Sequence, residues 1–315
     1  MKIRKGTNTI TPRGSGLAVR MAKAWQLYLF MLIPLLYYAV FQYAPMYGIQ
    51  IAFKNFSGSL GILGSPWVGF ANFTRFFNSY QFVLLIKNTL LLSFLTLICG
   101  FPIPIILALL LNQVGNKKFK KVVQTVTYAP YFLSTVVLVG MVFVFLAPRG
   151  GIINNIIHIF GGQSVFFMGD PGWFRPLYII TDIWQQSGWA SIIYIAALAG
   201  ISPELHEAAI VDGASRLRRI WHIDIPGILP TIVIMLIMRS GSLMSVGFDK
   251  AYLMQTSLNL DASEIISTYV YKVGLTANTQ FSFAAAVGLF NSVINLILIA
   301  TVNQIAKKVG ETSLW

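Results

Sequence analysis

The stretch PELHEAAIVDGASRLRRIWHIDIPGILP, residues 203 to 230, is a charged island between two long apolar runs. Ser202 and Pro203 form a typical N-cap and first-turn pair, and the carboxylates of Glu204 and Glu207 are expected to complement the helix dipole in the first turn. A short helix is therefore predicted to begin at Pro203.

The dipeptide Asp212-Gly213 interrupts this helix, because Asp-Gly favours a turn and glycine takes a positive φ without strain. Three arginines follow among apolar residues, and Pro226 and Pro230 punctuate the return to an apolar run. The stretch is therefore predicted to form a helix, a turn and a second helix. On these residues alone it could equally be an amphipathic linker on a membrane surface, with its arginines on the inner side.

The composition is that of a polytopic membrane protein. Of 315 residues, 56% are hydrophobic and only 10% are charged, which is too apolar for one soluble core. The net charge of +13 comes from basic residues dispersed in short loops between apolar runs, a distribution that follows membrane topology rather than nucleic-acid binding. Membrane lipid is therefore an expected partner, and nucleic acid is not.

A basic tail and six apolar spans account for most of the chain. The tail is residues 1–23, and residues 24–315 are expected to form a single transmembrane domain. The six spans are predicted at residues 25–43, 82–111, 123–146, 176–198, 229–247 and 283–305. With both termini inside, the inner segments carry 15 Lys and Arg residues and the outer loops carry 6. This bias predicts that both termini are cytoplasmic.

Three local features are predicted within this scheme. A break or strong kink is expected near Gly100, which precedes two prolines in the second span. Residues 112–121 are expected to be a short basic loop on the inner side. Outside the membrane, Asp261 and Glu264 are interpreted as a capping box that opens a short helix ending near Gly274.

The charged stretch resembles the EAA loop of ABC-importer permeases, in which EAA is followed after two residues by DGA and later by a proline. Here the pattern is formed by Glu207-Ala208-Ala209, Asp212-Gly213-Ala214 and Pro226. Three further segments resemble the second half of maltose-type carbohydrate permeases, namely residues 246–250, 265–271 and 284–295. The resemblance extends from about residue 25 to the end of the chain.

The resemblance implies an all-α membrane protein with six transmembrane helices and the type I ABC-importer permease fold, in the bacterial cytoplasmic membrane. It implies that residues 202–226 are the coupling region that docks in a groove on a separate ATPase subunit. The expected coupling residues are Glu204, Glu207, Ala208, Ala209, Asp212, Gly213 and Ala214.

The resemblance also implies the mechanism and the partners. The permease would import a carbohydrate, expected to be an oligosaccharide, by alternating access. A second, homologous permease subunit would complete the pathway, usually as a heterodimer. Two ATPase subunits would bind ATP and Mg, and an extracytoplasmic binding protein would deliver the sugar. This chain itself would be a non-catalytic translocation subunit.

Polar and aromatic residues within the spans are candidates for the sugar path, because sugars need directional hydrogen bonds and an aromatic surface for stacking. The candidates are Asp182, Trp184, Gln185, Trp189, Arg239, Asn291 and Asn295. The open alternative is that the amides join helices to each other by hydrogen bonds.

Two charges within these spans each have two interpretations. Asp182 is either a proton-relay acid or an acid that is paired or hydrated in a polar cavity. Arg239, expected near the middle of the fifth span, either holds the bundle together or contacts an anionic sugar. An alternative function is a self-sufficient secondary transporter or channel that uses these two charges as a coupling pair. The docking loop and the lack of an evident internal repeat favour the importer.

Neither a catalytic nor a metal site is predicted. The run of residues 160–164, FGGQS, is similar to part of the signature of ABC ATPases, but the chain lacks a phosphate-binding GxxxxGK[ST] loop. His158, His206 and His222 lie in isolated contexts, so a metal site is not expected. No cofactor is expected on this chain.

Overall fold

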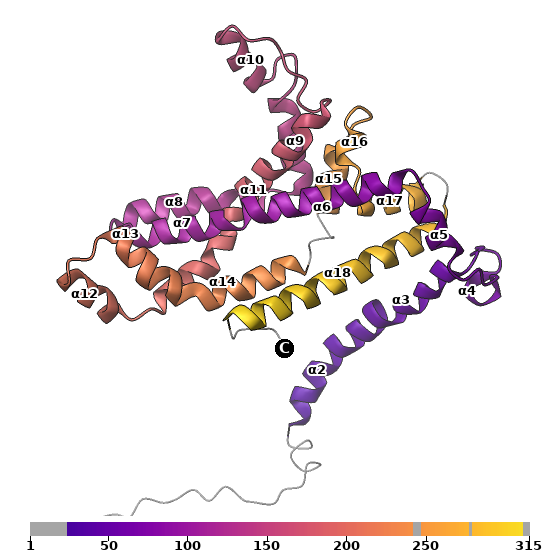
Figure 1. Cartoon of the computed structure of the whole chain (residues 1–315), viewed down its shortest axis with the longest axis horizontal. Coiled ribbons are helices and arrows are strands. Elements are labelled where there is room, and N and C mark those ends of the chain that lie inside the picture. The colour runs from indigo at the N-terminus through magenta and orange to yellow at the C-terminus, as the bar shows by residue number, and fades with distance from the viewer. Residues whose placement is uncertain (1–23, 242–246, 277–278, 311–315) are drawn as a thin grey trace, which may run out of the picture. The chain divides into compact units, whose positions relative to one another are not determined.

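The computed structural model describes residues 24–241, 247–276 and 279–310 (Figure 1). The chain divides into two compact units, residues 1–50 and 51–315. The predicted basic tail, residues 1–23, lies outside the described residues.

The first unit is one apolar helical segment. It consists of α2 (Trp25–Tyr38), a π-helical turn (Ala39–Tyr43), α3 (Ala44–Met46) and the start of a 3₁₀ helix (Tyr47–Phe53). Pro34 lies within α2, where the helix continues through it. The segment is long and apolar enough to span a membrane, as the first predicted span requires.

The second unit is built on long helices with shorter elements between them. The long helices are α6 (Gln81–Gly100), α7 (Pro102–Gln113), α8 (Lys117–Tyr128), α9 (Thr135–Phe145), α11 (Pro171–Ala199), α14 (Ile225–Ser240) and α18 (Phe281–Gly310). The shorter helices are α4 (Gly61–Gly64), α5 (Ala71–Phe77), α10 (Ile152–Ile159), α12 (Pro203–Val211), α13 (Arg216–Arg219), α15 (Phe248–Met254), α16 (Leu260–Ser263) and α17 (Ile266–Tyr271). Among the described residues no strand forms, and one isolated antiparallel bridge joins Lys54 to Trp67.

The predicted break near Gly100 is only a short interruption. Helix α6 ends at Gly100 and α7 begins at Pro102, but Phe101 between them keeps helical angles, with φ −67° and ψ −41°. A proline at the first position of a helix removes an N–H group that would have no helical partner there. The two helices therefore run on as one span of residues 81–113.

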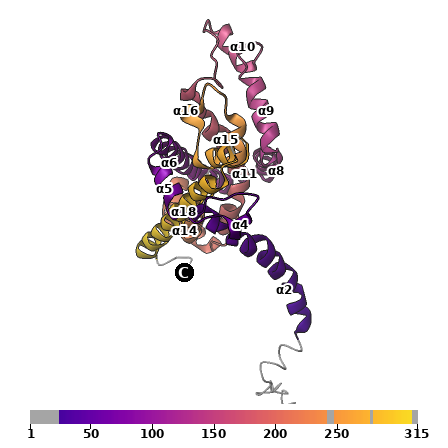
Figure 2. The ribbon, with the colours of Figure 1, turned by 90° about the vertical axis from the view of Figure 1, so that its right-hand side faces the viewer.

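The third predicted span is two helices rather than one. A 3₁₀ turn at Ala129–Phe132 separates α8 from α9, and the two helices meet at 100°. Pro130 lies in that turn, and the hydroxyl of Ser134 then accepts a hydrogen bond from the N–H of Val137 to open α9. Helix α9 packs against α15 and the first half of α11, and α10 beyond it projects away from the other helices of this unit (Figures 1 and 2).

The predicted basic loop at residues 112–121 is partly wrong. Its lysines lie on the first turns of α8, because the side chain of Asn116 caps that helix by accepting hydrogen bonds from the N–H groups of Lys118 and Phe119, at 3.0 and 3.2 Å. A strong N-cap therefore outweighs the repulsion between neighbouring lysines.

Six spans are consistent with the structure. Four helical segments of the described chain are long and apolar enough to cross a membrane, and two bent pairs bring the number to six. One bent pair is the third predicted span, and the other is α11 with α12, which meet at 72°.

Helix α11 is the central helix of the second unit, in contact with α6, α7, α8 and α14. At its closest approach to α8, a Cβ on Gly188 would collide with the carbonyl oxygen of Thr127, so only glycine fits there. Near the other end of α11, an apolar cluster of Ala108, Leu198 and Ile228 joins α7, α11 and α14.

The capping box predicted at Asp261 and Glu264 is wrong. Glu264 follows the last residue of α16, and its carboxylate instead contacts Lys272 Nζ at 3.0 Å. The side chain of Asn259 organises this turn by accepting hydrogen bonds from the N–H of Thr256 at 3.0 Å and from the hydroxyl of Ser263 at 2.8 Å. The helix predicted to end near Gly274 is split into α16 and α17, followed by a π-helical turn at Lys272–Thr276.

Candidate functional site

The EAA stretch forms the predicted helix, turn and helix at one end of the bundle (Figure 1). Helix α12 begins at Pro203, and the hydroxyl of Ser202 accepts a hydrogen bond from the N–H of Glu204 at 3.3 Å. Of the two carboxylates expected in the first turn, only Glu204 lies there. Glu207 lies in the second turn, because α12 starts four residues before it.

The DGA residues form the C-terminal cap of α12. Asp212 is the C-cap, Gly213 has a φ of +72°, and Ala214 follows. The N–H of Ala214 donates to the carbonyl of Ala209 at 2.8 Å, and the N–H of Gly213 donates to that of Ile210 at 3.0 Å. This pair of hydrogen bonds is the Schellman motif, which needs a left-handed residue at the position of Gly213. The motif therefore explains why DGA follows EAA at this spacing.

Helix α12 is a surface element that buries none of its side chains. Glu204, Glu207 and Ala208 are exposed, and Ala209 is half-buried. Two apolar side chains, Leu205 and Val211, are also exposed, at 55% and 88%. Apolar and acidic groups side by side on an exposed helix are typical of a surface that another protein covers.

A buried carboxylate that the sequence analysis did not identify links α12 to the bundle. Asp224 is fully buried where α14 begins, and its Oδ1 lies 3.3 Å from Nε2 of His206 on α12. Gln113, at the end of α7, donates from Nε2 to the other carboxylate oxygen at 3.0 Å. We call these three residues the Asp224 joint. The signal in the sequence was a lone acid between Ile223 and Ile225, at the entrance to an apolar span.

Asp182, from the middle of α11, is half-buried and pairs with Lys250 of α15, with a distance of 3.6 Å between Nζ and Oδ1. The ammonium group of Lys250 also donates to the carbonyl of Tyr178 at 3.0 Å. Lys250 therefore fastens α15 to α11. Lys250 lies beyond the predicted fifth span, and its contact with α11 was not predicted from the sequence. The alternative coupling pair of Asp182 with Arg239 is not the ion pair observed for Asp182.

The aromatic and amide candidates on α11 face two different surroundings. Gln185 is buried and donates to the carbonyl of Leu133 at 2.9 Å, and Trp189 stacks on Tyr131 with 4.6 Å between the ring centroids. Both contacts join α11 to the 3₁₀ turn before α9. Trp184 instead lines a mostly apolar pocket between α9, α10 and α11. The contact of Gln185 is of the kind expected if amides join helices.

Arg239 lies in the last turn of α14 rather than near the middle of a span, because the helix ends at Ser240. A Cβ on Gly100 of α6 would lie 4.0 Å from Nη1 of Arg239, so the guanidinium group reaches the α6–α7 junction. Part of the predicted fifth span, residues 242–246, lies outside the described residues.

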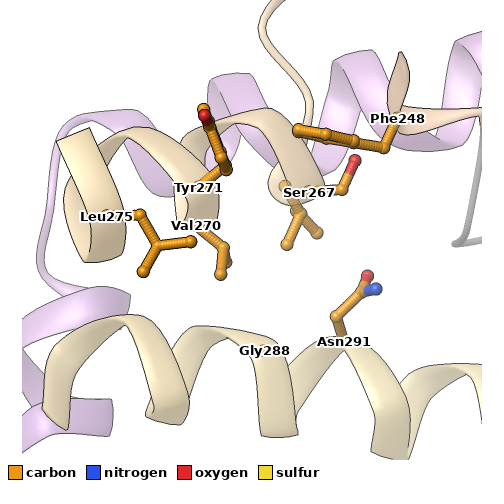
Figure 3. Close-up of a pocket in the computed structure, with 8 residues that line it drawn as sticks. Phe248, Ser267, Val270, Tyr271, Leu275, Gly288 and Asn291 are labelled. Atoms are coloured by element: carbon orange, nitrogen blue, oxygen red, sulfur yellow. The ribbon is translucent and has the colours of Figure 1, made fainter. Parts of the chain in front are cut away.

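Asn291 and Asn295 lie one turn apart on α18, and both are half-buried. Asn291 lines a pocket of about 360 Å³, and its side chain points toward Ser267 of α17 and Phe248 of α15 (Figure 3). The pocket is lined by Phe248, Ile266, Ser267, Val270, Tyr271, Leu275, Gly288 and Asn291. Of the predicted path residues, the structure therefore places Asn291 in this pocket and the α11 candidates elsewhere.

Comparisons with known proteins agree with this architecture. Residues 100–311 match the family described as "binding-protein-dependent transport system inner membrane component". The chain is 46% identical over 299 residues to the polygalacturonan/rhamnogalacturonan transport system permease protein YteP of Bacillus subtilis (strain 168), covering 95% of this chain and 93% of YteP.

Two solved structures are similar over nearly the whole chain. One is a crystal structure of a bacterial ABC transporter involved in the import of the acidic polysaccharide alginate, at 40% identity and a TM-score of 0.87, covering 94% of this chain and 100% of the other. The second is a bacterial alginate ABC transporter in complex with an alginate pentasaccharide-bound periplasmic protein, at 39% identity and a TM-score of 0.88, covering 95% of this chain and 100% of that one. The chain therefore belongs to the family of inner-membrane components of binding-protein-dependent transport systems.

Proposed function

We propose that this chain is a permease subunit of an ATP-driven importer whose substrate is an acidic oligosaccharide. The observation that carries the proposal is likeness along nearly the full length of the chain to two permeases of such systems. Polygalacturonan and alginate differ in their sugars, but both are chains of monosaccharides that carry carboxylate groups. The shared feature of the two substrates is therefore negative charge, and we assign that feature to the substrate of this chain.

The exposed helix α12 supports the assignment of ATP hydrolysis to separate subunits. A helix with exposed Leu205 and Val211 and no buried side chain has a surface available for a partner. In this proposal α12 faces the cytoplasm, both termini lie on the same side, and two ATPase subunits bind ATP and Mg. A second, homologous permease completes the pathway, and an extracytoplasmic binding protein delivers the substrate.

The pocket between α15, α17 and α18 is our candidate for contact with the carbohydrate. Phe248, Tyr252 and Tyr271 form a ring cluster at its edge, with centroids 5.1 to 5.6 Å apart. The hydroxyl of Ser267 and the amide of Asn291 supply polar groups. Aromatic faces stack on sugar rings, and hydroxyls and amides bind their hydroxyl groups.

Reconstitution in proteoliposomes tests the proposed function. The complex would contain this chain, the second permease, the ATPase and the external binding protein. We expect oligogalacturonate or an alginate oligosaccharide to stimulate ATP hydrolysis and to accumulate inside. A neutral maltooligosaccharide of the same length is the control. Equal stimulation and uptake of the neutral sugar would contradict the assignment of an acidic substrate, and uptake without ATP would contradict the importer.

A further inference from the structure

The joint formed by Asp224, His206 and Gln113 brings three separate elements together at one buried carboxylate. Asp224 begins α14, Gln113 ends α7, and His206 comes from the exposed helix α12. A fully buried carboxylate is costly unless both oxygens have partners. Oδ2 of Asp224 accepts a hydrogen bond from Gln113, and Oδ1 has only the contact with the His206 ring at 3.3 Å.

Helix α12 has little other attachment to the bundle. None of its side chains is buried, and among the described residues His206 is the α12 side chain whose polar atoms reach another element. Its remaining connections are the chain itself, through Ile201 and Ser202 to the end of α11 and through residues 212–215 to α13. A force applied to α12 therefore passes along the chain at either end of the helix or directly across the Asp224 joint.

The start of α14 lies close to both the Asp224 joint and the linker between α11 and α12. A π-helical turn, Ile220–Asp224, ends at the carboxylate, and such wide turns are frequent at functional sites. One turn later, a Cβ on Gly227 would lie only 2.6 Å from Cδ1 of Ile201 in the α11–α12 linker. The linker and the joint thus meet successive turns at the start of α14.

We propose that the Asp224 joint transmits movement of α12 to α7 and α14, so that His206 and Gln113 are positioning residues for coupling and take no part in docking. This inference rests on the proposed function, because it requires an ATPase that moves α12. The polar contact at His206 carries the movement of α12 to the buried carboxylate, and Gln113 and the chain of α14 carry it onward into two spans.

The test compares His206→Leu with His206→Gln in the reconstituted complex. Leucine removes the ring nitrogen that faces Asp224, whereas the glutamine amide places a nitrogen near the position of Nε2. We expect the leucine variant to keep the ATPase bound but to import sugar about tenfold more slowly per ATP hydrolysed, because the polar contact between α12 and the buried carboxylate is lost. His206→Gln should restore most of the transport, and Gln113→Leu should show the same defect more weakly.

His158→Leu is the matched control, since it makes the same chemical change on α10, far along the chain from the joint. The inference is overturned if His206→Leu imports sugar at the normal ratio, if it loses the ATPase from the complex, or if leucine and glutamine variants are equally defective. A wild-type complex that shows no ATP-dependent import would instead reject the proposed function.

Discussion

The two ends of α11 are held in different ways. Near its first turn, Arg175 donates to Oδ1 of Asn88 at 2.9 Å, and the amide of Asn88 donates to the carbonyls of Asp261 and Glu264 at 2.8 and 3.1 Å. We call these four residues the Asn88 network. After its last turn, the exposed helix α12 is tied back through the Asp224 joint.

The Asn88 network joins α6, α11 and the α16 region by direct hydrogen bonds to Asn88, whose side chain is buried, so this end of the molecule is expected to keep its shape. The α12 end is expected to move more easily, because a helix without buried side chains can shift as a rigid body. If the proposed importer works by alternating access, the external end, held by the Asn88 network, stays fixed while the α12 end moves.

The largest expected effect is on stability and follows from Asn88→Leu, which disrupts the Asn88 network. The substitution leaves the half-buried Arg175 and two carbonyl groups without their amide partner. We expect a loss of stability of about 3 kcal/mol. The measurement is the melting temperature of the purified chain in detergent. Asn155→Leu, at an exposed position on α10, is the matched control. Equal melting temperatures for the two variants would remove the basis for calling this end rigid.

Lys250→Met should have the next largest effect. It leaves the half-buried Asp182 without its ammonium partner and should cost about 2 kcal/mol. Adding Asp182→Asn should recover part of the loss, because the uncompensated charge is then gone. The melting temperatures of the two single variants and the double variant measure this coupling. Strictly additive losses would show that the two side chains stabilise the fold independently.

In the turn after α12, Gly213→Val should impair coupling to the ATPase without unfolding the bundle. A Cβ at this position meets no atom within 4 Å, so the cost arises from the φ of +72° and not from a collision. A left-handed, β-branched residue costs about 1.5 kcal/mol. Gly213→Asn should be milder, since asparagine tolerates this region.

Sugar-stimulated ATP hydrolysis and transport measure the effect of the Gly213 variants. Transport should fall more with valine than with asparagine, while both variants stay folded, with melting temperatures within about 5 °C of the wild type. Wild-type transport by the valine variant would show that the Schellman turn has no part in coupling.

The smallest expected effect concerns Gln185 and Asn295. Gln185→Leu loses the hydrogen bond to the carbonyl of Leu133 and should cost about 1 kcal/mol of stability. Asn295→Leu tests the α18 stripe in the same way. A stable complex that has lost transport would place the residue in the sugar path. A destabilised complex that still transports would make it a contact between helices.

Local features of the sequence were predictable, and distant partnerships were not. The cap at Ser202 and the turn at Gly213 each depend on residues within one helical turn, and both were found where predicted. Asp224 and Lys250 were missed because their partners are separated from them along the chain, at His206, Gln113 and Asp182.

Arg239 was misplaced for a different reason. Hydropathy defined its span as residues 229–247, whereas the helix begins at Ile225 and ends at Ser240. The apolar run continues past the end of the helix, so composition alone could not locate that end. Element boundaries of this kind are set by backbone capping and by neighbouring helices rather than by hydropathy.

Site-directed cross-linking would show whether α12 is the surface that meets the ATPase. In a Cys99→Ala background, Leu205→Cys places a single thiol on exposed α12, and Leu258→Cys places one on the exposed segment between α15 and α16. A thiol-to-amine cross-linker should join the Leu205→Cys chain to the ATPase, and the Leu258→Cys chain to the external binding protein but not to the ATPase. Cross-linking of Leu258→Cys to the ATPase, or of Leu205→Cys to the binding protein, would contradict the assignment of the two ends.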